Sequence, residues 1–74
     1  MILERVTLPV ARKIAGLTQK GLGDALNPRV SESTVANWEN GRSEPTISQA
    51  KQIGEVTGVP YDKIIFLRKN TVKP

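Results

Sequence analysis

The sequence predicts an all-α fold, a compact bundle of five short helices in a single domain spanning residues 1–74. Two observations support this prediction. Helix-capping residues and helix breakers alternate along the whole chain, and apolar residues recur between them at helical spacing. A chain of 74 residues also buries only roughly 60% of its unfolded surface, which leaves room for one modest core. We expect that core to span about residues 7–67, with residues 68–74 as a basic, flexible tail.

The first two helices are expected at about residues 8–15 and 19–26. Thr7 and Thr18 are residue types that cap a helix N-terminus, and Pro9 suits a first helical turn. Three residues of the second helix share one face at helical spacing and are expected in the core: Leu22, Ala25 and Leu26.

The third helix is expected to follow Ser31, a second N-cap residue type. Glu32 then lies in the first turn, where a negative charge favours the positive end of the helix. The helix is expected to end at Glu39 or Asn40, because Gly41 suits the left-handed conformation that terminates helices.

The fourth helix opens with a capping box, in which Thr46 is followed three residues later by Gln49. Gly58 ends this helix, and Pro60 is expected to start a fifth. The inner face of the fourth helix is predicted to carry Ile47, Ala50, Ile53 and Thr57, and the fifth helix to carry Tyr61, Ile64 and Ile65.

The N-terminal residues 1–6 are too apolar for a wholly free arm, since they include Ile2, Leu3 and Val6. Two arrangements are open. The segment packs on the fifth helix, or it pairs as a strand with residues 65–67.

Composition limits the function classes. Eleven Lys and Arg against seven Asp and Glu give a formal charge of +4, which fits a polyanionic partner as well as a merely solvated surface. The chain has no Cys and no His, no Gly-rich phosphate loop and no acidic pair with a credible pocket. We therefore expect no enzyme, cofactor or metal. Without a long apolar run or a signal-peptide pattern, we expect no membrane contact, and the absence of Cys suits a place in the cytoplasm.

An ordered set of residues carries a resemblance to a known family. It comprises Ala11-Arg12, Gly16-Leu17-Thr18-Gln19, Leu22, Ser33-Thr34-Val35, Trp38-Glu39-Asn40-Gly41-Arg42 and Pro45, followed by Gly58-Val59, Asp62 and Ile64-Ile65. This set resembles the lambda-repressor and Cro type of helix-turn-helix. The short length and the residues 61–67 resemble small regulators encoded by temperate phages of Gram-positive bacteria.

The resemblance implies that the third helix enters the DNA major groove and reads base edges. With Val35 and Trp38 turned inward, the candidate base-contacting residues are Glu32, Ser33, Ala36 and Asn37. Asn can contact adenine with two hydrogen bonds, and Glu can accept from the cytosine amino group. The alternatives are an ordinary surface residue for Asn37 and a first-turn helix charge for Glu32.

Phosphate contacts are implied for residues around the reading helix: Thr18, Gln19, Arg29, Thr34, Asn40, Arg42, Ser43 and Thr46. Arg42 is the strongest candidate, because a guanidinium suits phosphate oxygens. The alternatives are a plain cap for Thr18, an exposed side chain for Gln19 and a solvated one for Arg29. The turn at residues 27–31 is about two residues longer than is usual in the family, which puts the helix tilt in question.

The resemblance also implies a partly buried ion pair between Arg12 and Glu39. Four apolar residues near the C-terminus supply either a dimer or partner surface or part of the monomer core: Tyr61, Ile65, Phe66 and Leu67. The expected function is a sequence-specific transcriptional regulator that binds operator DNA as a homodimer. The alternative is a protein-binding module, acting as antirepressor, co-repressor or antitoxin, because Val30 to Gly41 contains no Lys or Arg.

Overall fold

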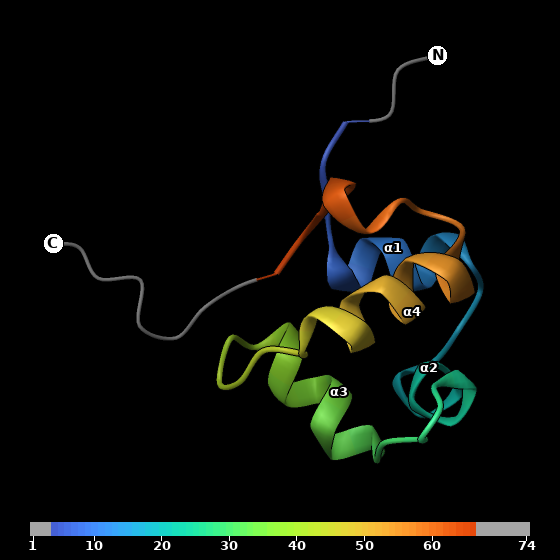
Figure 1. Ribbon diagram of the computed structural model, residues 1–74, viewed down its shortest axis with the longest axis vertical. Coiled ribbons are helices and arrows are strands. Elements are labelled where there is room, and N and C mark those ends of the chain that lie inside the picture. The colour runs from blue at the N-terminus through green and yellow to red at the C-terminus, as the bar shows by residue number, and fades with distance from the viewer. Residues whose placement is uncertain (1–3, 67–74) are drawn as a thin grey trace, which may run out of the picture.

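A computed structural model describes residues 4–66, and within them helices dominate. The elements are β1 (Val6–Thr7), α1 (Leu8–Ile14), α2 (Gln19–Ala25), α3 (Glu32–Glu39), α4 (Ile47–Thr57), the 3₁₀ turn η1 (Tyr61–Lys63) and β2 (Ile64–Ile65). In Figure 1, α1 and α4 lie across the middle of the molecule, α2 and α3 share one end, and η1 occupies the other. The longest described helix, α4, has 11 residues, so none in this part of the chain could span a bilayer.

Local capping signals determine where the helices begin and end. The hydroxyl of Thr18 accepts a hydrogen bond from the Gly21 amide at the start of α2. Ser31 caps α3 in the same way, and Thr46 opens α4 with the complete capping box. Gly58 ends α4 in the left-handed conformation, with φ at +79°. These caps were predicted from the sequence, and the structure confirms them. Thr7, also predicted as a cap, stands at the N-cap position of α1 without a side-chain capping hydrogen bond.

The core lies where the four helices and the short sheet meet. Its buried residues are Leu8, Ala11, Leu22, Leu26, Val35, Trp38, Ile53, Val59 and Ile64. Two predicted core residues are wrong. Ala25 is exposed, because Leu22 and Leu26 already fill the narrow inner stripe of α2. Ile47 is 73% exposed, since it is the first residue of α4 and lies at the open edge of the core.

The predicted fifth helix is wrong. After Pro60 the chain makes only the three-residue turn η1, and Ile64 and Ile65 then run extended. Their β-branched side chains favour a strand, and the backbone gains a parallel partner in β1, with Val6 opposite Ile64. Strand pairing of the N-terminal segment is therefore correct for Val6. Its partner strand is β2, which shares only Ile65 with the expected partner residues 65–67. Ile2, Leu3 and Leu67 lie outside the described residues.

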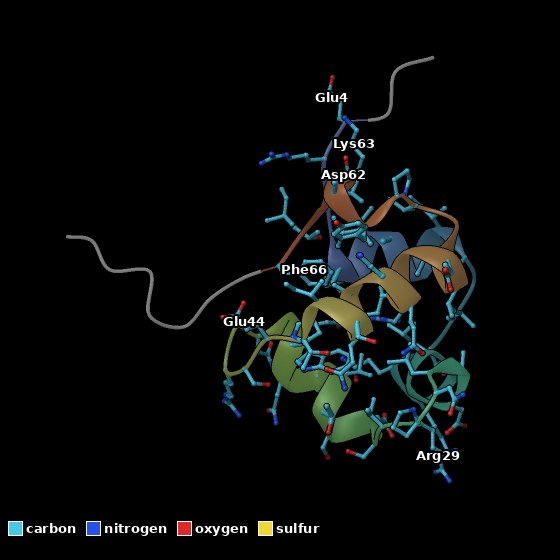
Figure 2. The ribbon with its side chains drawn as sticks, in the orientation of Figure 1. Glu4, Arg29, Glu44, Asp62, Lys63 and Phe66 are labelled. Carbon is cyan, nitrogen blue, oxygen red and sulfur yellow. The ribbon has the colours of Figure 1, made fainter. Side chains whose placement is uncertain are left out.

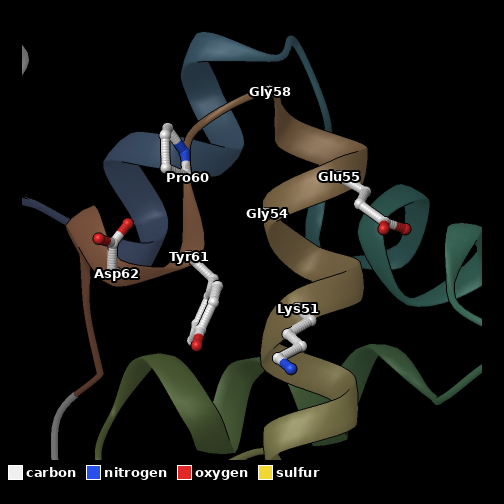
Figure 3. Close-up of a pocket in the computed structure, with 7 residues that line it drawn as sticks. All are labelled: Lys51, Gly54, Glu55, Gly58, Pro60, Tyr61 and Asp62. Atoms are coloured by element: carbon white, nitrogen blue, oxygen red, sulfur yellow. The ribbon is translucent and has the colours of Figure 1, made fainter.

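Gly54 allows η1 to lie directly on α4. A Cβ at this position would stand 2.9 Å from the backbone nitrogen of Tyr61, too close for any side chain. The Tyr61 ring therefore lies beside α4, over a shallow hollow, where it faces Lys51 (Figure 3). The Lys51 ammonium is 5.9 Å from the ring centre, within reach of a cation–π interaction.

Candidate nucleic-acid interface

The turn between α2 and α3 folds back onto α2 at Gly23. The Gly23 carbonyl accepts a hydrogen bond from the Val30 amide, with 3.1 Å between nitrogen and oxygen. A Cβ on Gly23 would collide with the Val30 carbonyl oxygen. Glycine at this position is therefore needed for the close approach of the turn, although glycine is less favourable than alanine inside a helix.

Gln52 on α4 holds the other side of the same turn. The backbone amide of Asn27 donates to the Gln52 side-chain oxygen at 2.8 Å, and the Gln52 side-chain amide donates to the backbone carbonyl of Asn27 at 3.0 Å. The lengthened turn is thus tied to the helix behind it. No local sequence pattern indicates this role of Gln52, because 25 residues separate it from Asn27.

The outward side of α3 carries the four residues predicted to contact bases. Glu32 and Ser33 are exposed, while Ala36 and Asn37 are half-buried. We call these four residues the reading face. The opposite side of the helix is buried as expected, with Val35 fully covered and Trp38 only 3% exposed. In Figure 1, α3 lies at the edge of the molecule, at the end opposite η1.

The loop after α3 is folded against the C-terminal end of that helix. Gly41 adopts a φ of +77°, and the amide of Arg42 then donates to the Asn37 carbonyl at 2.9 Å. The side chains of Asn40, Arg42 and Ser43 are all exposed. The structure therefore brings these three candidate phosphate ligands next to the reading face, with polar groups that water or a phosphate can reach.

Three of the predicted phosphate ligands are threonines whose hydroxyls already serve helix N-termini. Thr18 and Thr46 accept backbone hydrogen bonds in α2 and α4, and Thr34 Oγ1 lies 3.0 Å from Ser31 Oγ at the start of α3. An accepting hydroxyl keeps its own hydrogen, so the Thr18 and Thr46 caps still leave a donor. Cap and phosphate ligand are therefore compatible roles for these two side chains.

A polar cluster at the junction of three helices uses Gln19. The Arg12 guanidinium donates to Glu39, with 2.7 Å between Nε and Oε2, and also to the Leu17 carbonyl at 2.9 Å. Gln19 donates to Glu39 Oε1 at 2.9 Å. Gln19 is half-buried, so it is not the freely exposed side chain that one interpretation assumed.

Arg29 extends from the lengthened turn toward α2. Its guanidinium lies 3.2 Å from Asp24, which also accepts from Lys20 at 2.9 Å. The hydrogen bond from Lys20, with the charges of Lys20 and Arg29, holds the pKa of the Asp24 carboxyl below its ordinary value of 3.8. All three side chains are well exposed. Arg29 and Glu44 stand at opposite sides of this end of the molecule (Figure 2).

A helix-turn-helix family model matches residues 10–64, which is most of the chain. The protein belongs to the lambda-repressor and Cro type of helix-turn-helix family. This family match indicates a DNA-binding regulator. No curated protein and no solved structure was found to match the chain. In this helix-turn-helix protein, α2 and α3 form the pair that gives the family its name.

The C-terminal apolar residues divide between the core and the surface. Phe66 is half-buried and packs against the core, whereas Tyr61 and Ile65 are 43% and 39% exposed. Leu67 lies outside the described residues. Phe66 thus belongs to the monomer core, whereas Tyr61 and Ile65 remain candidates for a dimer or partner surface.

Proposed function

We propose that this protein is a sequence-specific transcriptional regulator, of the kind that temperate phages encode, and that α3 reads its operator in the major groove. The supporting observation is the two-sided character of α3. Val35 and Trp38 anchor the helix in the core, and the reading face is turned away from them. A helix held in this way can present a constant set of polar groups to base edges.

The reading face offers contacts of different chemistry. Asn37 suits adenine, Glu32 suits the amino group of cytosine, and the Ala36 methyl suits a thymine methyl. Arg42, with Asn40 and Ser43, would hold phosphates beside these bases, because the loop folds back onto the end of α3. In this arrangement the phosphate contacts fix the register of the protein, and the reading face supplies specificity.

We further propose that the protein binds its operator as a homodimer. A single module of this size contacts few base pairs, and two half-sites about one helical turn apart restore affinity and specificity. The exposed side chains of Tyr61 and Ile65 supply apolar surface for the contact. Sedimentation of the protein with a two-half-site duplex should therefore give a complex that contains two protomers.

The test is DNA binding measured by fluorescence anisotropy across a salt series, with duplexes from the protein's own genomic neighbourhood. Asn37→Ala should reduce discrimination between sequences, at about 1–3 kcal/mol for a lost bidentate base contact. Arg42→Ala should weaken binding to all sequences and reduce the salt slope by about one. Lys63→Ala is the control of matched charge, since Lys63 lies at the end opposite α3 (Figure 2).

A second candidate function rests on the charge of α3. The helix contains no Lys or Arg and exposes Glu32 in its first turn, which is unusual for a surface that approaches phosphates. The same scaffold could bind another regulator or a toxin instead of DNA. This function is favoured if no duplex is bound selectively at low salt and a regulator or toxin encoded beside the protein binds the reading face.

A further inference from the structure

A groove with a mixed polar and apolar lining, including two acidic residues, lies between the loop after α3, the start of α4 and η1. It encloses about 320 Å³ and is lined by Glu44, Pro45, Ile47, Ala50, Tyr61, Asp62 and Phe66. Ile47 is 73% exposed and Tyr61 is 43% exposed, so much of the apolar lining faces solvent. We call this the Ile47 groove. Phe66 and Glu44, which both line this groove, are labelled on the left side of the molecule in Figure 2.

We propose that residues 67–74 of the same chain dock in the Ile47 groove. This segment has the complementary composition, because it carries three cations and no acid: Arg68, Lys69 and Lys73. It also supplies two apolar side chains, Leu67 and Val72, for the apolar lining. The acids that it would meet, Glu44 and Asp62, are both exposed at the groove. Opposite charges with matching apolar groups are what a docked segment requires.

The position of Phe66 favours the chain's own segment over a separate partner. Phe66 lines the groove and is the residue from which the segment continues. Eight residues reach about 26 Å when extended, at about 3.3 Å each, which is ample to cross the groove. Direct attachment gives the segment an effective concentration in the millimolar range. The volume is near the lower limit of ligand pockets, roughly 300 Å³, and suits a few side chains better than another protein's helix.

Docking has a consequence that rests on the proposed DNA binding. Glu44 lies two residues beyond Arg42, in the loop proposed to hold phosphates. A carboxylate there repels the DNA backbone, and cations docked beside it would offset that repulsion. The docking itself does not depend on DNA, so its test can fail or succeed independently of the proposed function.

The test uses the full chain with Pro74→Cys, which gives a unique attachment point for a nitroxide because the chain has no other Cys. Paramagnetic relaxation is then measured at the backbone amides of Ile47 and Ala50. Glu44→Gln with Asp62→Asn should reduce this relaxation at least twofold, since each amide keeps the shape of the exposed side chain that it replaces and removes its charge. The matched control is Asp24→Asn, an exposed acid outside the groove, which should leave the relaxation unchanged.

Equal relaxation in the parent and in the double variant would overturn the proposal, because an undocked segment would not respond to the acids. A mixture of isotope-labelled protein without nitroxide and unlabelled protein with nitroxide distinguishes docking within one chain from docking between two copies. No relaxation at Ile47 in that mixture supports docking within one chain. Relaxation in the mixture would overturn the proposal and assign the groove to the segment of a second copy.

Discussion

Arg12 Nε lies 2.7 Å from Glu39 Oε2, and this ion pair joins α1 to the last turn of α3. Gln19 at the start of α2 donates to the other carboxylate oxygen, so Glu39 receives hydrogen bonds from two helices. The two charged side chains are only 12% and 7% exposed. A single carboxylate on α3 therefore links this helix to both α1 and α2.

Replacement of Glu39 should be strongly destabilising. Glu39→Ala leaves the Arg12 guanidinium nearly buried without its counter-ion, and we expect a loss of about 3–5 kcal/mol in the free energy of unfolding. Urea denaturation followed by Trp38 fluorescence measures this loss. The double variant Arg12→Met, Glu39→Leu should recover part of it, because no unpaired charge remains. Glu55→Ala, at an exposed position on α4, should change stability by less than about 0.5 kcal/mol. A loss from Glu39→Ala as small as this would show that the pair contributes nothing.

Gly23→Ala should destabilise the fold despite the higher helix propensity of alanine. The added Cβ would collide with the backbone carbonyl of Val30, and the turn before α3 would have to move. We expect a loss of about 1–3 kcal/mol, as for overpacking elsewhere. Gly21→Ala, on the same helix, meets two side-chain atoms and no backbone, the Thr18 hydroxyl at 3.1 Å and Leu17 Cδ2 at 3.6 Å, and should stay within about 1 kcal/mol of the parent. Thermal unfolding of both variants checks this, and equal stabilities would contradict it.

Gly58→Ala isolates the effect of backbone conformation. A Cβ at this position meets no atom within 4 Å, so only the φ of +79° opposes the substitution. We expect a loss of about 1–2 kcal/mol, the ordinary cost of the left-handed conformation for an L-residue. Gly58→Asn should lose less, since Asn tolerates this conformation better. If alanine and asparagine have the same effect in urea denaturation, the conformational explanation is wrong.

The pKa of Asp24 should be below 3.8 in the folded protein, chiefly because of its hydrogen bond from Lys20. A carboxyl whose folded pKa is lowered stabilises the fold above its unfolded pKa, and this contribution is lost as the pH falls through the folded pKa. The pH window is therefore below about 3.8. Titration of the Asp24 side-chain carbon by NMR measures the pKa directly. Lys20→Met should raise it more than Arg29→Met does, and the reverse order would contradict the assigned cause.

Glu32→Gln should separate the two interpretations of that residue. If Glu32 reads cytosine, the variant should bind DNA of unrelated sequence more tightly and lose preference at one base pair, because a repelling charge and a specific acceptor are removed together. If the Glu32 charge only stabilises the positive N-terminal end of α3, the free energy of unfolding should fall by about 0.3–1 kcal/mol, and base preference should be unchanged. Competition binding with single-base operator variants, paired with thermal unfolding, distinguishes these results. Ser48→Ala, at an exposed position on α4, is the control.

The sequence by itself determined the features that depend on neighbouring residues. Thr18, Ser31 and Thr46 cap helices because their hydroxyls reach amides three residues on, and Gly41 and Gly58 end helices because glycine tolerates positive φ. The positions of the four helices follow from these local signals, whereas the family was indicated by the ordered set of residues that resembles it. The four residues of the reading face follow as well, because Val35 and Trp38 mark the buried side of α3.

Tertiary structure decided what depends on residues far apart in the chain. Ile64 is extended and not helical because Val6, 58 positions earlier, offers its backbone a strand partner. Gln52 holds Asn27, and Gln19 turns toward Glu39, through contacts across 25 and 20 residues. A hydrogen-bonding group takes whichever partner the folded chain brings within about 3 Å. Local sequence patterns cannot specify that partner, because it is brought close only when the helices pack.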